Sequence, residues 1–127
     1  MKKILVDTSV IIDFLRRKDK ENSAFYKTFF KKNNKPTISL TTITELWAGK
    51  SMEKKESLKF IKELVVNCEI LPSSSNTAKL AGKILRRSNY QISFQDAQIA
   101  SLALENNLPL LTLDKKDFGK IKGIKYF

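Results

Sequence analysis

The hydrophobic positions of this chain follow two periods, one typical of strands and one typical of helices. Five short apolar runs have strand length, at residues 2–7, 37–40, 69–72, 110–113 and 124–127. The last of these runs, beside lysines, is expected at a sheet edge.

The segments between the strands carry apolar residues at helical spacing. Such faces occur within residues 8–15, 23–32, 58–65, 80–85 and 93–104. Strands separated by helices favour a parallel sheet whose right-handed crossovers place helices on both faces. We therefore expect an α/β fold, a three-layer α/β/α sandwich around a mainly parallel sheet of four to five short strands, formed as a single domain over residues 1–127.

The stretch from residue 93 to residue 118 is the most informative part of the pattern. Ser93 and Asp96 have the spacing of a helix-start capping box, and the apolar run that follows nearly encircles a helix. A turn, a short strand and the carboxylates Asp114 and Asp117 come next. Thr42 and Glu45 have the same capping-box spacing, so Glu45 is also expected in the first turn of a helix.

Composition narrows the possible chemistry by what it lacks. The chain has no histidine, one cysteine (Cys68) and four glycines, none of them in a phosphate-binding loop motif. This excludes His-dependent nucleophilic and acid–base sites, histidine- or cysteine-rich zinc sites, and Walker or dinucleotide loops. With no signal peptide and no long apolar run, the expected location is the cytoplasm, with no membrane association.

The charge balance favours an anionic partner. Twenty-four Lys and Arg residues against thirteen Asp and Glu give a formal net charge of +11. Such a field attracts nucleic acid or an acidic protein. The candidate nucleic-acid contacts are Arg16, Arg17, Arg86, Arg87, Lys115 and Lys116. For Arg16 and Arg17, a simple interaction with the negative end of the preceding helix dipole is an equal alternative.

Four carboxylates fall at joints where an α/β sheet binds its ligands, outside the carboxyl ends of the strands. Asp7 and Asp114 follow strands, and Glu45 and Asp96 lie at helix starts. Each acid taken singly is more often a helix cap, so the case for function depends on the set. Four converging carboxylates repel one another unless cations or protons are bound.

Oxygen ligands of this kind suit a hard divalent ion, Mg²⁺ or Mn²⁺. Such an ion would polarise one phosphodiester and activate water, while the basic surface attracts the nucleic-acid backbone. Thr8, Ser9 and Thr112 lie beside the acids and are expected to hydrogen-bond the carboxylates or the waters of the ion. Asp117 is expected to serve as an auxiliary ligand or to cap a turn.

These residues together resemble the PIN-domain nucleases, most closely the VapC-type toxins of bacterial and archaeal toxin–antitoxin pairs. The resemblance covers nearly the whole chain and is carried by LVDTS at residues 5–9, TEL at 44–46, SFQDAQIA at 93–100 and LTLDKKDF at 111–118. Residues 88–90, SNY, stand where relatives often have a glycine-containing turn.

The resemblance implies a PIN-like fold and assigns the metal-binding acids to Asp7, Glu45, Asp96 and Asp114, with Asp117 at a less uniform acidic position. It also implies Mg²⁺- or Mn²⁺-dependent endoribonuclease activity on an RNA substrate, a homodimer, and neutralisation by a small antitoxin protein.

Two other functions compete with this interpretation. The first is a non-catalytic basic α/β module that binds nucleic acid or an acidic partner and uses its acids only as caps and surface charges. The second is an aspartyl phosphatase of the haloacid-dehalogenase type, which also begins with a strand-end aspartate. That class needs a second aspartate two residues later, where this chain has Ser9.

Overall fold

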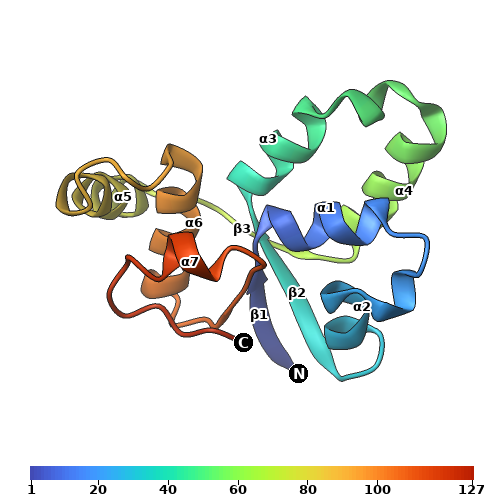
Figure 1. Cartoon of the computed structure of the whole chain (residues 1–127), viewed down its shortest axis with the longest axis horizontal. Helices are drawn as coiled ribbons and strands as arrows, with labels where there is room; N and C mark the ends of the chain where they lie inside the picture. Colours follow the sequence, from blue (N-terminus) through green and yellow to red (C-terminus); the bar gives the residue numbers. More distant parts are fainter.

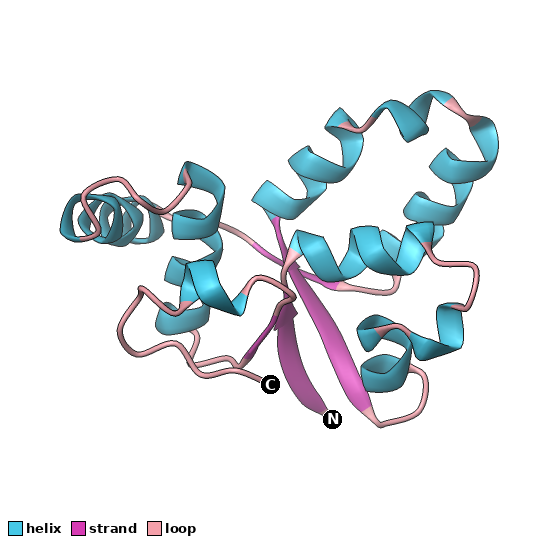
Figure 2. Cartoon of the chain, viewed as in Figure 1, coloured by secondary structure: helices cyan, strands magenta, loops and turns pink.

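The computed structural model describes residues 1–127, and its centre is a four-stranded parallel sheet. The strand order is β3-β2-β1-β4. The strands are β1 (Lys2–Val6), β2 (Asn34–Ser39), β3 (Glu69–Leu71) and β4 (Leu110–Leu111). Because all four strands are parallel, their carboxyl ends lie along the same edge of the sheet (Figure 2).

Seven α-helices surround the sheet. They are α1 (Thr8–Arg16), α2 (Ala24–Phe29), α3 (Leu40–Ala48), α4 (Lys55–Val66), α5 (Ser75–Arg87), α6 (Phe94–Glu105) and α7 (Lys115–Phe118). Figure 1 shows α1 to α4 on one side of the strands and α5 to α7 on the other. The expected α/β/α sandwich with a parallel sheet is therefore confirmed. None of these helices is both long and apolar enough to cross a lipid bilayer.

Two hydrophobic cores hold the helices against the sheet, and β1 contributes to both. Ile4 and Val6 belong to the core beneath α1 to α4, whereas Leu5 belongs to the core beneath α5 to α7. All three side chains are completely buried. This arrangement follows from the strand period of two residues, which sends successive side chains to opposite faces. The residue after Val6 is consequently held firmly at the sheet edge.

Helix α6 is the most buried of the helices, as its nearly encircling apolar pattern predicts. Ala97, Ile99, Ala100, Leu102 and Ala103 are all 3% exposed or less. Small alanine side chains on this helix let it pack closely beneath its neighbours. The first turn of α6 is thereby fixed relative to the sheet.

The structure shortens two of the expected strands. Strand β4 has only two residues, because the chain turns at Thr112 to hydrogen-bond with the end of β1. Residues 124–127 do lie beside β4, but they form a single bridge, Leu110 with Tyr126, and no regular strand. The expected position at the sheet edge is confirmed, but the pairing there is limited to this one parallel bridge.

Helix α3 begins earlier than the sequence pattern indicates. Its N-cap is Ser39, whose hydroxyl accepts a hydrogen bond from the Thr42 backbone N–H at 3.0 Å. Thr42 is therefore the third helical residue, and Glu45 lies in the second turn. The expected capping box of Thr42 with Glu45 was wrong, because Ser39 is a competing cap three residues upstream.

Residues 88–90 replace a glycine turn with strained backbone. Asn89 and Tyr90 have φ values of 54° and 59°, in the left-handed region that glycine adopts most easily. Two non-glycine residues therefore hold this turn in a backbone conformation that glycine adopts at lower cost.

We predict that Phe118→Ala lowers the free energy of unfolding by about 3 to 5 kcal/mol. Phe118 is fully buried in the core beneath α5 to α7, so its truncation leaves a cavity. Urea denaturation measures the change. Phe94→Ala is the control, because Phe94 is 64% exposed and its truncation should cost about 0.5 kcal/mol or less. Equal destabilisation of the two variants would contradict this description of the core.

Candidate active site

Asp7 is the centre of the candidate site. It follows β1 directly, is only 3% exposed, and occupies the N-cap position of α1. Its side chain makes no capping hydrogen bond to that helix. Instead, Oδ2 accepts hydrogen bonds from Ser9 Oγ at 2.7 Å and from Thr112 Oγ1 at 2.8 Å. Asp7 is therefore no ordinary helix cap.

The hydroxyls of Ser9 and Thr112 also join the ends of β1 and β4. Ser9 Oγ accepts a hydrogen bond from the Leu113 backbone N–H at 3.2 Å, and Thr112 Oγ1 accepts one from the Asp114 N–H at 2.9 Å. Both hydrogen bonds of the Asp7 carboxylate go to Oδ2. One oxygen is thus fixed, and Oδ1 is left for another ligand.

Glu45 is positioned by a relay of hydroxyls that sequence reasoning missed in part. Thr8 Oγ1 donates to Glu45 Oε1 at 2.8 Å and lies 2.9 Å from Thr42 Oγ1. Ser39 Oγ lies 3.2 Å from Thr42 Oγ1. Since a hydroxyl has one hydrogen and the carboxylate can only accept, the Thr8 hydrogen belongs to Glu45. The chain of donors runs from Ser39 through Thr42 and Thr8.

The three-residue spacing of Ser39 and Thr42 was the available signal for this relay. It marks a helix cap that begins at the end of a strand, beside the other strand ends. The Ser39 and Thr42 side chains are completely buried, so the hydrogen bond between Thr42 and Thr8 holds the Thr8 hydroxyl in place. Buried hydroxyls with satisfied hydrogen bonds position a charged neighbour at little cost.

The other three candidate carboxylates have raised pKa values, and the charge of Asp7 contributes to each of them. Burial raises the pKa of Asp96 from 3.8 to about 6, and the charge of Asp7 adds to this effect. Burial followed by the charge of Asp7 also raises the pKa of Asp114. For Glu45, burial raises the pKa, the Thr8 hydrogen bond opposes this change, and Asp7 again contributes to the increase.

Asp96 lies in the first turn of α6, but its carboxylate does not cap the helix. The Ser93 hydroxyl accepts a hydrogen bond from the Asp96 backbone N–H at 3.0 Å. The reciprocal bond from the Ser93 N–H to the Asp96 carboxylate, which a capping box requires, is not formed. Only half of the expected capping box is present, so the Asp96 carboxylate is not bonded to the Ser93 backbone.

Asp117, the auxiliary acid, lies at the margin of this group. It is an exposed residue of the short helix α7, and its charge contributes to the raised pKa of both Asp96 and Asp114. Whether Asp117 serves as an auxiliary ligand or caps the turn stays a prediction.

The six basic residues suggested by the sequence are dispersed around the molecule. Arg17 pairs with Asp13 at 2.8 Å, and Arg16 lines a groove that also contains Glu45. The Lys115 ammonium lies 5.7 Å from the centre of the Tyr126 ring. Arg86, Arg87 and Lys116 are exposed. The structure does not bring the six together into one patch.

The donor set fits a hard divalent cation. Every candidate ligand is a carboxylate oxygen and one oxygen of Asp7 is open, while burial and then the charge of Asp7 raise the pKa of the other acids. No three carboxylates lie close enough to form a complete ligand group by themselves. A bound ion would therefore need waters in its remaining positions, as Mg²⁺ commonly retains.

A family model described as the PIN domain matches residues 4–124. The chain belongs to the PIN-domain family. Two relatives match it over nearly their full length. Ribonuclease VapC1 of Methanocaldococcus jannaschii is 32% identical, covering 98% of this chain and 87% of its own. Ribonuclease VapC of Rickettsia bellii is 30% identical, covering 96% and 92%. The PIN domain of this chain is therefore of the VapC type.

Solved structures agree with this assignment at the level of fold. DNA-bound VapBC from Salmonella typhimurium superimposes with a TM-score of 0.83 at 24% identity, covering 100% of this chain and 98% of that one. VapBC2 from Rickettsia felis, bound to a promoter DNA fragment, gives a TM-score of 0.79 at 22% identity, covering 98% and 97%.

The pKa of Asp96 makes the stability of this PIN domain depend on pH. Because the folded state binds the Asp96 proton more tightly than the unfolded state, this contribution is fully present below pH 3.8 and is lost as the pH rises through about 6. The full displacement corresponds to about 3 kcal/mol, which solvent screening of a half-exposed carboxyl reduces to about 1 to 2 kcal/mol.

We therefore predict that Asp96→Asn raises the free energy of unfolding at pH 7 by about 1 to 2 kcal/mol in EDTA, with little difference from the parent at pH 4. Urea denaturation at both pH values measures this. Asp19→Asn is the control, because a hydrogen bond from Asn22 lowers the pKa of the Asp19 carboxyl and no stabilisation is expected. A destabilised Asp96→Asn at pH 7 would contradict the prediction.

Proposed function

We propose that this PIN domain is a divalent-metal-dependent endoribonuclease that acts as the toxin of a toxin–antitoxin pair. The observation that carries the proposal is the buried Asp7 carboxylate, which has one oxygen held by Ser9 and Thr112 and the other left open. Burial, together with the charge of Asp7, also raises the pKa of Glu45, Asp96 and Asp114. Charges that destabilise one another in the folded state are retained where a cation uses them. Two full-length relatives are named ribonucleases, which supports RNA as the substrate.

Asp7, Glu45, Asp96 and Asp114 would hold Mg²⁺ or Mn²⁺, with Asp117 as an auxiliary ligand. When bound, such an ion polarises a phosphodiester and lowers the pKa of water. The protein's part is to fix the carboxylates. Ser9 and Thr112 orient Asp7, and the hydroxyl of Thr8 orients Glu45.

Two of the ligands, Asp7 and Asp96, have rigid supports, which suits a site that must keep its geometry. Asp7 follows the central strand β1, and Asp96 lies in the first turn of the buried helix α6. Ligands on strands and buried helices are held more accurately than ligands on loops. Asp114 and Asp117 are exposed, so they are expected to adjust when a cation or a phosphate approaches.

We predict that Asp96→Asn reduces RNA cleavage by about 100-fold or more while the protein remains folded. Cleavage of a fluorescent single-stranded RNA in the presence of Mn²⁺ measures the activity. Saturating Mn²⁺ should also raise the melting temperature of the parent and have a smaller effect on Asp96→Asn. Asp13→Asn is the control, because Asp13 pairs with Arg17 on the surface of α1.

If Asp96→Asn cleaves RNA with Mn²⁺ as well as the parent does, the proposed mechanism is wrong. If calorimetry detects no Mn²⁺ binding and Asp7→Asn leaves RNA binding unchanged, the non-catalytic basic module becomes the better explanation.

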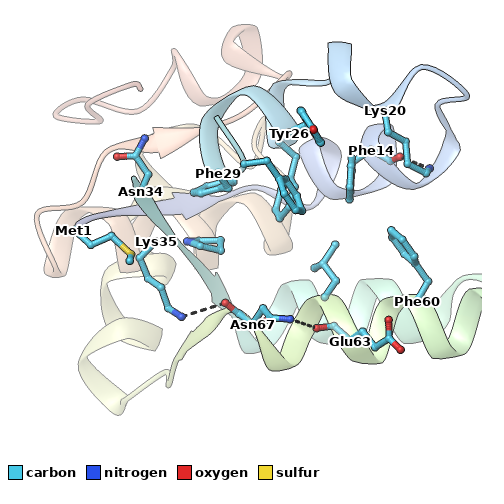
Figure 3. Close-up of a pocket in the computed structure, with 14 residues that line it drawn as sticks. Met1, Phe14, Lys20, Tyr26, Phe29, Asn34, Lys35, Phe60, Glu63 and Asn67 are labelled. Atoms are coloured by element: carbon cyan, nitrogen blue, oxygen red, sulfur yellow. Dashed lines mark hydrogen bonds between the residues drawn. The ribbon is translucent and has the colours of Figure 1, made fainter. Parts of the chain in front are cut away.

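An antitoxin partner is supported by an apolar groove between α2 and α4. Figure 3 shows the groove, which has a volume of about 580 Å³ and is lined by aromatic rings from α1, α2 and α4. Phe30 and Phe60 are 63% and 37% exposed, and Tyr26 stacks on Phe30 with ring centres 4.8 Å apart. Exposed aromatic rings around a concavity are typical of a surface that binds a partner.

A second groove continues from the first toward the acids. It has a volume of about 470 Å³, shares Lys20 and Phe60 with the apolar groove, and includes Glu45 among its lining residues. An antitoxin segment with apolar side chains among the aromatic rings could therefore extend along the second groove, past Lys20, to Glu45. This path would let one partner both bind the toxin and block its site. The homodimer remains a prediction from family resemblance.

We predict that Phe60→Glu weakens antitoxin binding by about 10-fold or more, because it places a charge in the apolar groove. Calorimetric titration with the antitoxin measures the affinity, and RNA cleavage should be retained. Val66→Glu is the matched control on the same helix, since Val66 is 82% exposed and outside the groove. Equal effects of the two variants would show that the groove is not the binding surface.

A further inference from the structure

A third groove is lined by residues of α5 and of the segment that follows α7. Figure 1 shows these elements on the side of the strands opposite α1 to α4. It has a volume of about 280 Å³. Its floor is apolar and includes the buried side chains Ile84, Ile92 and Ile121. Its polar lining consists of four cations and one hydroxyl, with no carboxylate, and these are Lys83, Arg87, Lys120, Lys122 and Ser88.

The four cations have no anionic partner within the chain. None of them takes part in an ion pair, since the three ion pairs of the structure use only Lys3 and Arg17 as cations. None lies over an aromatic ring, where the only cations are Lys2, Lys20 and Lys115. Four like charges around one concavity repel one another, so an anion in the groove would relieve that repulsion.

The groove is connected to the acidic site through Asp117. The Lys120 backbone N–H donates a hydrogen bond to the Asp117 carbonyl oxygen at 3.4 Å. Asp117 and the candidate ligand Asp114 lie within the same short turn, since the Asp117 backbone N–H donates to the Asp114 carbonyl oxygen at 3.1 Å. On the other wall, Arg87 and Ser88 lead through the tight turn at residues 89–90 to α6, whose first turn carries Asp96.

We propose that this groove, formed by Lys83, Arg87, Lys120 and Lys122, binds the phosphate backbone of the RNA substrate beside the cleavage site. The proposal rests on the proposed ribonuclease function. Its position favours RNA over an acidic protein, because a strand held there remains connected to the phosphate that is cut. Backbone contacts of this kind position a nucleic acid without reading its bases. The groove would therefore add affinity for single-stranded RNA of any sequence.

The test uses a fluorescent single-stranded RNA and measures its binding by anisotropy in EDTA, so that no cleavage occurs. The groove variant is the quadruple substitution of Lys83, Arg87, Lys120 and Lys122 by Gln. The control variant replaces Lys31, Lys32, Lys59 and Lys62 by Gln. All eight side chains are exposed. Each variant removes four positive charges, from +11 to +7, and circular dichroism confirms that both are folded.

The groove variant should bind RNA at least about 10-fold more weakly at 0.1 M salt, and the control less than about 3-fold more weakly. Each phosphate that is no longer neutralised reduces the slope of log K against log salt by about 0.7 for a single strand, so three or four such phosphates reduce it by about 2 to 3. With Mn²⁺ present, KM for RNA should rise about 10-fold in the groove variant, with kcat changed less than about twofold.

Equal weakening of RNA binding by both variants would overturn the proposal in favour of diffuse charge attraction, and no weakening would overturn it directly. Poly-L-glutamate is the second probe. If the groove variant no longer bound poly-L-glutamate but still bound RNA normally, the groove would be reassigned to an acidic protein partner. These results are independent of catalysis. If the unsubstituted protein bound RNA through the groove but never cleaved it, the nuclease proposal would be wrong and the groove proposal would stand.

Discussion

The charge of Asp7 is the constraint around which the structure is built. A carboxylate that is 3% exposed must be stabilised from within the protein, because removal from water disfavours its charged form. Ser9 and Thr112 donate to one of its oxygens, and its place before α1 puts it at the positive end of that helix dipole. Burial and this fixed charge together raise the pKa of the other three acids, so the fold is less stable at neutral pH than with neutral side chains there. It tolerates this cost because two hydrophobic cores fix β1 and α6 from both faces of the sheet.

Residue patterns predicted the fold well because its signals are local and strong. The two-sided burial of β1 and the nearly encircling apolar face of α6 follow directly from side-chain period. The start of α3 could not be predicted as securely, since Ser39 and Thr42 are both good caps and tertiary contacts chose Ser39. Residues 124–127 form no regular strand for a related reason. They have strand composition, yet the neighbouring β4 has only two residues with which they can pair.

The acids of the site could be recognised from the sequence because they lie at strand ends and helix starts. The hydroxyl groups that orient these acids could be recognised only in part. Thr8 directly follows Asp7 in the sequence but donates a hydrogen bond to Glu45. Thr42, which supports the Thr8 hydroxyl, is 34 residues away from Thr8. The grooves were not visible at all from the sequence. Phe30 has the helical spacing of a core aromatic, and Lys83 and Lys120 come together only through the packing of α5 with the chain after α7.

The two signs of charge are arranged so that attraction and chemistry occur at different places. Lysines and arginines without an ion-pair partner lie on the outer surface, whereas Asp7 directly follows the carboxyl end of β1 and the adjacent Thr8 donates a hydrogen bond to Glu45. A phosphate attracted by the outer charge meets a field of its own sign at Asp7, Glu45 and Asp96. Under the proposed function, the basic surface would bind the RNA backbone, whereas entry of one phosphate among the acids would require a divalent cation to offset their charge. This separation would let a chain with a net charge of +11 attract RNA and still make the proposed cleavage depend on a metal ion.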